Sequence, residues 1–371
     1  MCFAFRAPKH HPHRILVVAQ ANIASTTGGS ITVFFHFCRL LSDRGYDVTG
    51  SCFSEDPRRP TLLDDRVRFV NLHDRYGKKT TYEKAYNRFV GEWKPDLIVF
   101  FFPHYCLEMR LKRRFKHIPR IIMFHSRPDY LFSQLPDFAE RLRPYYVNTC
   151  SQVLFESYRT LLPAYIQEGP VHVIANGITQ LPKRPDARQE HKKIVYFSRV
   201  DRMKGVDLLI ASMALVKEKH PDWCVDIYGD IEPESYGQEL QEAIRNAGLS
   251  EQIRLKGKSH RSLEETLQDY DFSVFPSRVE GFSIGQGETL SSGLAMVGFR
   301  FCSGVNELII DGENGFLCDN TDAFAQAINR LIEDSALREK MGRNARASML
   351  PYAPERIDEK WTSLVRSILE S

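Results

Sequence analysis

The 371-residue sequence contains no apolar run long enough to cross a membrane. Its longest such run, residues 97–103, has the length of a buried strand, whereas a membrane-spanning helix needs about 20 apolar residues. The first thirteen residues, MCFAFRAPKHHPH, lack the apolar centre of a signal peptide. These two absences predict a cytoplasmic protein, in which residues 1–13 form a flexible basic tail rather than a metal site.

Paired cysteine motifs and nucleic-acid signatures are also missing. The eight cysteines are scattered without a Cys-x2-Cys pair, and most lie in apolar stretches. They are therefore interpreted as reduced, buried side chains rather than as disulfides or zinc ligands. No helix-turn-helix, zinc or RNA-binding pattern accompanies the basic residues, so nucleic acid is not expected as a partner.

Charge is distributed unevenly along the chain. Residues 1–180 carry 25 Lys and Arg against 16 Asp and Glu, a net +9, and residues 181–371 carry 25 against 31, a net −6. The densest cluster, here called the basic segment, is residues 110–116. We weigh two interpretations of it: a solvated helix face, or a contact for an anionic membrane or phosphorylated acceptor, with each cation near lipid worth about 1 kcal/mol. The five cations of the basic segment are Arg110, Lys112, Arg113, Arg114 and Lys116.

Short apolar runs alternate with helical patterns along the whole chain, which predicts an α/β fold with parallel sheets. Residues 181–192 are polar and contain proline, as a linker does. We predict a first doubly wound domain at residues 14–180, a second at 193–350, a ligand cleft between them, and a last helix within 351–371. The predicted strands are residues 14–20, 48–52, 67–72, 97–101, 120–125, 146–149 and 171–174, then 193–198, 224–228, 253–255, 272–275, 295–299 and 315–318.

The central stretch of the chain, residues 275–293, holds two carboxylates, Glu280 and Glu288, with seven residues between them. A buried strand precedes it, and Ser283 can cap a helix that ends near Gly293. Glu280 would lie in the loop at the carboxyl end of that strand, where open α/β sheets bind ligands. The amides of Phe282, Ser283 and Ile284 would lie at the helix N-terminus, a geometry that receives phosphate.

Two cations follow the first strand of the predicted second domain. Arg199 comes directly after it, and Lys204 precedes the next helix. Together they can neutralise a diphosphate, Arg199 through its planar fork and Lys204 as a point charge. Either residue alone would be interpreted as an ordinary charged residue of the protein surface.

Glu-x7-Glu after Phe-Pro-Ser, together with Phe-Ser-Arg-x4-Lys-Gly, resembles the motifs of retaining glycosyltransferases of family 4. The resemblance covers nearly the whole chain from Arg14. It implies the GT-B fold: two Rossmann-like domains facing across a cleft, with a C-terminal helix crossing back to the first. It further implies a nucleotide-diphosphate sugar as donor, no required metal, and a glycan or lipid-linked acceptor. Family members commonly build bacterial polysaccharide or lipopolysaccharide, here at the inner face of the cytoplasmic membrane.

The resemblance also assigns roles to individual residues. Arg199 and Lys204 hold the diphosphate, Glu280 contacts sugar hydroxyls and Glu288 the ribose, while His125 faces the transferred sugar. Further donor contacts are implied for Gly28 and Gly29, for the loop containing Lys258, and for the helix N-terminus at Phe282, Ser283 and Ile284, with weaker roles for Ser126 and Arg127.

Some features depart from the family pattern, and some rival interpretations stay open. Gln286 and Gly287 replace the hydrophobic pair often seen before the second glutamate. Residues 299–304 replace the small residues that usually lead into the sugar phosphate loop. Asp269 and Asp271 form an Asp-x-Asp pair at the wrong end of a strand for metal, so they are interpreted as a cap. A nicotinamide dehydrogenase would need Gly-x-Gly-x2-Gly after the first strand, which is absent. A non-catalytic nucleotide-sugar-binding protein and a phosphorylase or epimerase remain alternatives.

Overall fold

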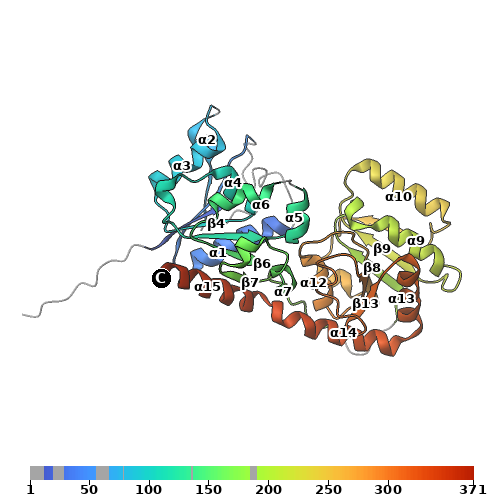
Figure 1. The fold of residues 1–371 in the computed structure, drawn as a ribbon. Helices are drawn as coiled ribbons and strands as arrows, with labels where there is room; N and C mark the ends of the chain where they lie inside the picture. The colour runs from blue at the N-terminus through green and yellow to red at the C-terminus, as the bar shows by residue number, and fades with distance from the viewer. Residues whose placement is uncertain (1–11, 20–28, 56–66, 78, 135–136, 184–189) are drawn as a thin grey trace, which may run out of the picture. The chain divides into compact units, whose positions relative to one another are not determined.

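The computed structural model describes residues 12–19, 29–55, 67–77, 79–134, 137–183 and 190–371 (Figure 1). These residues form two compact units. The first contains the described residues up to Ile174 together with Asp358–Ser371, and the second contains Ala175–Ile357. Each unit is built around one sheet of parallel strands that alternate with helices, so the prediction of two doubly wound domains is confirmed.

The first unit has a seven-stranded parallel sheet. Its neighbouring strands β1 (Arg14–Val18) and β4 (Leu97–Phe100) are almost wholly apolar and buried. Continuous apolar strands are what a sheet covered on both faces requires. In spatial order the strands are β3 (Arg68–Asn71), β2 (Asp47–Cys52), β1, β4, β5 (Arg120–Phe124), β6 (Thr149–Val153) and β7 (Val171–Val173).

Helix α1 (Gly29–Asp43) shows why the connecting segments fold as helices. Phe34, Phe37 and Leu41 recur at helical spacing and are buried on one face. The other described helices of this unit are α2 (Leu72–Tyr76), α3 (Tyr82–Trp93), α4 (Pro103–Met109), α5 (Pro128–Gln134), α6 (Phe138–Leu142), α7 (Glu156–Arg159) and α8 (Ala164–Gln167), with 3-10 turns η1 (Arg113–Phe115) and η2 (Arg143–Tyr145).

The predicted strands match the observed ones to within two residues at each end, except at residues 146–149, and two of the differences have a local cause. The predicted strand at residues 146–149 is wrong, because η2 occupies the preceding residues and Asn148 has a left-handed φ of 51°, so that β6 begins only at Thr149. The predicted strand at residues 67–72 ends at Asn71. The Asn71 side chain accepts a hydrogen bond from the His73 amide and thereby starts α2.

The basic segment is not a helix face, which corrects one of the two interpretations of it. Helix α4 ends at Met109, and Arg110 has a left-handed φ of 39°, so the segment is a loop that contains only the turn η1. Buried Leu111 anchors the loop, and the Asn87 side chain binds its backbone through the Lys112 amide at 2.8 Å. All five cations are exposed, and none forms an ion pair with an acid that the structure describes.

The second unit has a six-stranded parallel sheet. Its strands, in spatial order, are β10 (Ile253–Gly257), β9 (Cys224–Tyr228), β8 (Lys193–Phe197), β11 (Phe272–Phe275), β12 (Met296–Phe299) and β13 (Gly315–Cys318). Its helical elements are η3 (Arg202–Lys204), α9 (Val206–Val216), α10 (Glu234–Asn246), α11 (Leu263–Leu267), α12 (Ile284–Ser291), α13 (Thr321–Glu333), α14 (Ser335–Met349) and η4 (Leu350–Tyr352).

The last helix, α15 (Pro354–Glu370), drawn in red in Figure 1, leaves the second unit and joins the first at Asp358. Trp361 packs edge-on against Phe37 of α1, with ring centroids 4.9 Å apart. His36 of α1 hydrogen-bonds the Asp358 carboxylate at 2.8 Å. The predicted return of the C-terminal helix to the first domain is therefore confirmed. No described helix is both long enough and apolar enough to span a membrane.

Candidate functional site

Strands β8 and β11 are parallel neighbours in the second sheet, so their carboxyl ends lie at the same edge. The loop after β8 carries Arg199 and Lys204, and the loop after β11 carries Glu280. The register therefore brings together three residues that lie up to 81 positions apart in the sequence. This edge is where doubly wound sheets bind ligands.

Lys204 and Glu280 form an ion pair between Lys204 Nζ and Glu280 Oε1. Their side chains are only 11% and 9% exposed. Buried Ser277 donates a second hydrogen bond to the same carboxylate oxygen, at 2.9 Å. A buried charge needs such partners to offset its desolvation, so the lysine and the hydroxyl hold the carboxylate in one orientation.

Arg199, in the same loop as Lys204, has a more open side chain. Its side chain is 51% exposed, and its Nη1 lies 3.8 Å from Asp201 Oδ2. The hydroxyl of buried Tyr196 donates to the Arg199 carbonyl at 2.6 Å, which fixes the backbone and leaves the side chain accessible. Arg199 can thus reach an anionic ligand without first breaking a close ion pair.

The turn η3, which carries Lys204, packs tightly on the loop after β11. Asp201 caps the turn by accepting hydrogen bonds from the amides of Met203 and Lys204, at 2.9 and 3.2 Å. Gly205 has a left-handed φ of 69°, and a Cβ at this position would lie 2.0 Å from the Pro276 carbonyl oxygen. Only glycine fits this close approach.

Helix α12 begins at the same edge, as predicted. Ser283 is its N-cap and accepts a hydrogen bond from the Gln286 amide at 3.4 Å. Phe282 and Ile284 flank the cap and are partly exposed. The first turn of a helix directs amide groups and the positive end of the helix dipole outward, which suits a phosphate.

Glu288 lies one turn beyond Ile284 on α12 and is partly exposed. Burial raises the pKa of its carboxyl group, although a side-chain hydrogen bond with Thr179 acts in the opposite direction. The neighbouring departure from the family pattern has a steric reason. A Cβ on Gly287 would lie 2.2 Å from Ile178 Cδ1, so a larger residue there would force the Ile178 side chain to move.

In the first unit, His125 lies at the carboxyl end of β5 and packs against the rings of Phe101 and Phe102, whose centroids are 4.2 and 5.3 Å away. Its Nε2 is buried and has no hydrogen-bond partner among the described residues. Burial lowers the pKa of His125 to about 3, so the ring is neutral near pH 7. Gly29 begins α1, while Gly28 lies outside the described residues.

The remaining predicted residues are more scattered. Lys258 is exposed after β10, which is separated from β8 by β9, and no described contact links it to Lys204 or Glu280. Arg127 forms an ion pair with Asp129 at 2.7 Å. Asp271 accepts hydrogen bonds from the amides of His191 and Lys193, each at 3.1 Å, and Asp269 pairs with Arg261 at 2.5 Å, so both acids have structural partners.

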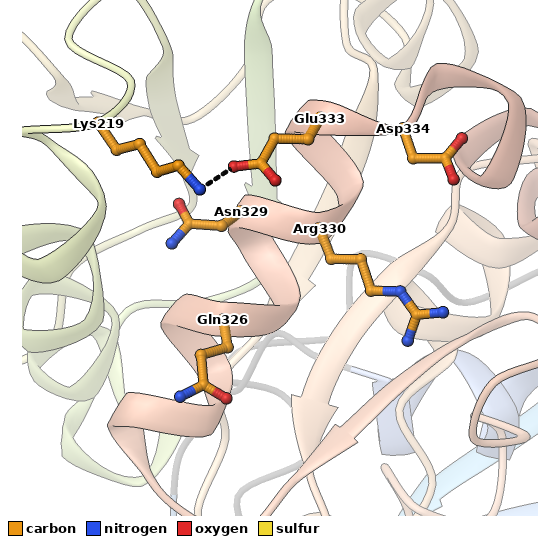
Figure 2. Close-up of a pocket in the computed structure, with 6 residues that line it drawn as sticks. All are labelled: Lys219, Gln326, Asn329, Arg330, Glu333 and Asp334. Carbon is orange, nitrogen blue, oxygen red and sulfur yellow. Dashed lines mark ion pairs between the residues drawn. The ribbon is translucent and has the colours of Figure 1, made fainter.

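Figure 2 shows a hollow elsewhere in the second unit, with a volume of about 470 Å³. It lies between the end of α13 and the residue Lys219 that follows α9, and Lys219 forms an ion pair with Glu333 across it. Helix α13 starts after β13 at the ligand edge and so ends at the opposite edge of the sheet. None of the predicted site residues lines the hollow; its lining residues are Lys219, Gln326, Asn329, Arg330, Glu333 and Asp334.

Four functional candidates were missed by the sequence analysis: Ser277, Tyr196, Arg278 and Asp207. Ser277 and Arg278 lie three and two residues before Glu280, and the Phe-Pro-Ser run that contains Ser277 served only as a marker of the strand end. The position of Ser277, three residues before Glu280, could have indicated that its hydroxyl contacts that carboxylate. The pairing of Arg278 with Asp207 across 71 positions had no local signal.

Doubly wound sheets in both units, with an arginine and a lysine at the ligand edge of the second, are typical of GT-B enzymes that use activated sugars. A family model described as "Glycosyl transferases group 1" matches residues 178–348, and one described as "Glycosyltransferase Family 4" matches residues 27–180. The two matches together span residues 27–348. The chain belongs to the group 1 glycosyltransferases and is an enzyme of that class.

Individual proteins agree with this assignment. An uncharacterized glycosyltransferase of Haemophilus influenzae is 26% identical over 93% of this chain and 98% of its own length. A poly(ribitol-phosphate) alpha-N-acetylglucosaminyltransferase of Staphylococcus aureus is 28% identical over 58% of this chain, which spans only 43% of that protein. Sucrose-phosphate synthase from Thermosynechococcus elongatus has the same fold, with a TM-score of 0.80 at 17% identity over 96% of this chain and 99% of that one. HepE of Anabaena, solved with UDP, also has this fold. Its TM-score is 0.77 at 19% identity, over 96% of this chain and 100% of that one.

Proposed function

We propose that the protein is a retaining glycosyltransferase that moves a hexose or related sugar from a nucleotide-diphosphate sugar to a glycan or lipid-linked acceptor. The process served would be synthesis of bacterial cell-envelope polysaccharide or lipopolysaccharide. The observation that carries the proposal is the ligand edge of the second sheet, where Arg199, Lys204 and the N-terminus of α12 gather positive charge near Glu280. The UDP bound to HepE and the polymer named for the S. aureus relative support a UDP-sugar and an envelope acceptor.

In this proposal the second unit binds the donor. Arg199 and Lys204 neutralise the diphosphate, assisted by the amides of Phe282, Ser283 and Ile284 at the start of α12. Glu280, oriented by Ser277, accepts hydrogen bonds from sugar hydroxyls. Glu288 accepts hydrogen bonds from the ribose hydroxyls. Burial raises the pKa of its carboxyl group, so hydrogen bonds from the ribose would stabilise the charged carboxylate.

The proposed transfer is a front-face substitution. The bond from the anomeric carbon to the diphosphate oxygen breaks, the acceptor oxygen bonds to the same face, and the departing phosphate oxygen takes the acceptor's proton. Double displacement would instead need a carboxylate nucleophile beneath the sugar. Glu280 is held by Lys204 and Ser277, which favours a binding role for it. The protein's contribution is then to stabilise charge that grows on the leaving diphosphate.

The first unit would bind the acceptor and the transferred sugar. We propose that neutral His125 contacts that sugar through its buried Nε2. Gly29 at the start of α1, its neighbour Gly28, and the loop of Lys258 in the second unit are proposed as further donor contacts. We also propose that no metal is required, since protein cations supply the charge; activity should then be unchanged by a chelator.

The basic segment is proposed to hold an anionic membrane surface, which makes the enzyme cytoplasmic and peripheral. The segment precedes β5, whereas His125 follows it. The segment therefore lies toward the amino ends of the strands of the first sheet, and His125 lies at their carboxyl ends. A five-residue strand spans roughly 17 Å. The cations therefore anchor the protein rather than touch the reacting groups.

The test is to incubate the purified protein with a panel of nucleotide sugars and lipid-linked glycan acceptors. We expect acceptor-dependent release of one nucleoside diphosphate, and a product whose anomeric configuration, read by NMR, matches that of the donor. The Arg199→Ala, Lys204→Ala double variant is the control. Tight nucleotide binding without release by the wild type would instead favour a non-catalytic binding protein.

A further inference from the structure

A second ion pair ties the two loops of the proposed donor site together. Arg278, two residues before Glu280, forms a two-pronged pair with Asp207 at the start of α9: Nη1 donates to Oδ1 at 2.8 Å and Nη2 to Oδ2 at 2.6 Å. This planar geometry fixes both distance and orientation. It is separate from the Lys204–Glu280 pair but joins the same two segments.

The rest of Arg278 also contacts the turn that carries Lys204. Its Nη1 donates to the Arg202 carbonyl at 2.8 Å, and its own amide donates to the Met203 carbonyl at 2.7 Å. Tyr236 of α10 holds the far side of the pair through a 3.2 Å hydrogen bond to Asp207. The turn is therefore attached to the loop through Arg202 and Met203, just before Lys204, and through Asp207, three residues after it.

We propose that Arg278 and Asp207 are positioning residues for sugar transfer, whose ion pair sets the place of Lys204 relative to Glu280. This inference rests on the roles proposed above for Lys204 and Glu280. Neither Arg278 nor Asp207 touches the donor in this proposal. Each acts by keeping the lysine where charge develops on the leaving diphosphate.

The exposure of the pair makes the proposal testable apart from folding. The side chains of Arg278 and Asp207 are 34% and 44% exposed. Ion pairs this open contribute about 0–1 kcal/mol to stability. Breaking the pair should therefore leave the fold intact, whereas a displacement of about 1 Å in a catalytic group can cost up to 10²-fold in rate.

The experiment compares Asp207→Asn, Arg278→Gln and Arg278→Lys with a matched control, Glu239→Gln. The control breaks the Arg202–Glu239 pair, which involves the same turn but leads to α10 instead of the loop after β11. We expect the three site variants to lower kcat by about 10-fold, with donor KM within about twofold. Arg278→Lys keeps the charge but loses the fork, so it should resemble Arg278→Gln. The control should keep wild-type kinetics, and all variants a wild-type thermal midpoint within a few degrees.

A double-mutant cycle separates this inference from the proposed function. In a Lys204→Ala background, Asp207→Asn should lower kcat by less than about twofold further, because the group that it positions is gone. A full 10-fold additional loss, or wild-type kcat in Asp207→Asn alone, overturns the positioning role and leaves the donor site standing. Wild-type kcat in Lys204→Ala alone overturns the role of Lys204 itself, and the inference with it.

Discussion

The ligand edge of the second unit and the basic segment of the first hold their charged residues in opposite ways. At the ligand edge of the second, charges are paired with one another, as in the Lys204–Glu280 and Arg278–Asp207 pairs. In the first, the five cations of the basic segment are exposed and form no ion pair with a described acid, and His125 keeps a buried nitrogen unpartnered among the described residues. The second unit thus presents a site arranged before any ligand binds, and the first presents groups that still lack a partner.

This difference predicts how each unit responds to mutation. A group held in place for catalysis affects the rate strongly, because the protein has already ordered it. An exposed cation acts through a field that salt screens over about 8 Å at physiological ionic strength, so its effect is smaller and depends on salt. The experiments below test that contrast in order of decreasing effect.

The largest effect is expected at the cations of the second unit. Arg199→Ala or Lys204→Ala should each lower kcat by about 10²-fold or more, because each removes charge that stabilises the leaving diphosphate. Turnover of the nucleotide sugar is the measurement, with circular dichroism to confirm the fold. An active double variant would contradict the assignment of both residues.

The two glutamates should separate by what they bind. Glu288→Ala should weaken binding of the nucleoside diphosphate by roughly 10-fold or more, since it loses charged hydrogen bonds to the ribose. Glu280→Ala should slow transfer yet leave nucleotide affinity unchanged or tighter, because Lys204 is released from its pair with Glu280. Calorimetry on both variants decides the matter. An equal loss of nucleotide affinity in the two variants would mean that the sugar and ribose ends of the donor are assigned the wrong way round.

The sequence predicted most of what local pattern controls. Strand β11, the Ser283 cap and the carboxyl-edge positions of Arg199, Lys204 and Glu280 follow from apolar runs and turn residues, and the structure has them. It could not predict contacts that depend on sheet register. The pairing of Lys204 with Glu280, 76 positions away, and the close contact of Gly287 with the Ile178 side chain arise only once the second unit is folded. The misplaced strand at residues 146–149 failed for a local reason, the positive φ of Asn148.

A smaller, salt-dependent effect is expected at the basic segment. Replacing Arg110, Arg113, Arg114 and Lys116 with Gln or Ser should reduce binding to anionic vesicles and activity on a lipid-borne acceptor. Hydrolysis of the donor without acceptor should stay close to wild type, because the segment lies at the sheet edge away from His125. Wild-type binding should also fall steeply between low and high salt. If the substituted protein sediments with anionic vesicles as the wild type does, the segment is only a solvated loop.

The smallest effect is expected from two half-buried histidines of the first unit, His125 and His104, and it appears in stability rather than rate. Burial lowers the pKa of His125 to about 3 and that of His104 to about 4, against an ordinary value of 6.5. As the pH falls below 6.5, the unfolded chain takes up protons that these folded side chains refuse, so stability is lost progressively toward pH 4. His125→Gln should therefore flatten the pH dependence of the urea midpoint between pH 4 and 6.5, relative to the exposed control His260→Gln. A slope equal to that of the wild type would mean that His125 titrates in the folded protein as it does in the unfolded one, and a neutral sugar contact could no longer be proposed for it at acidic pH.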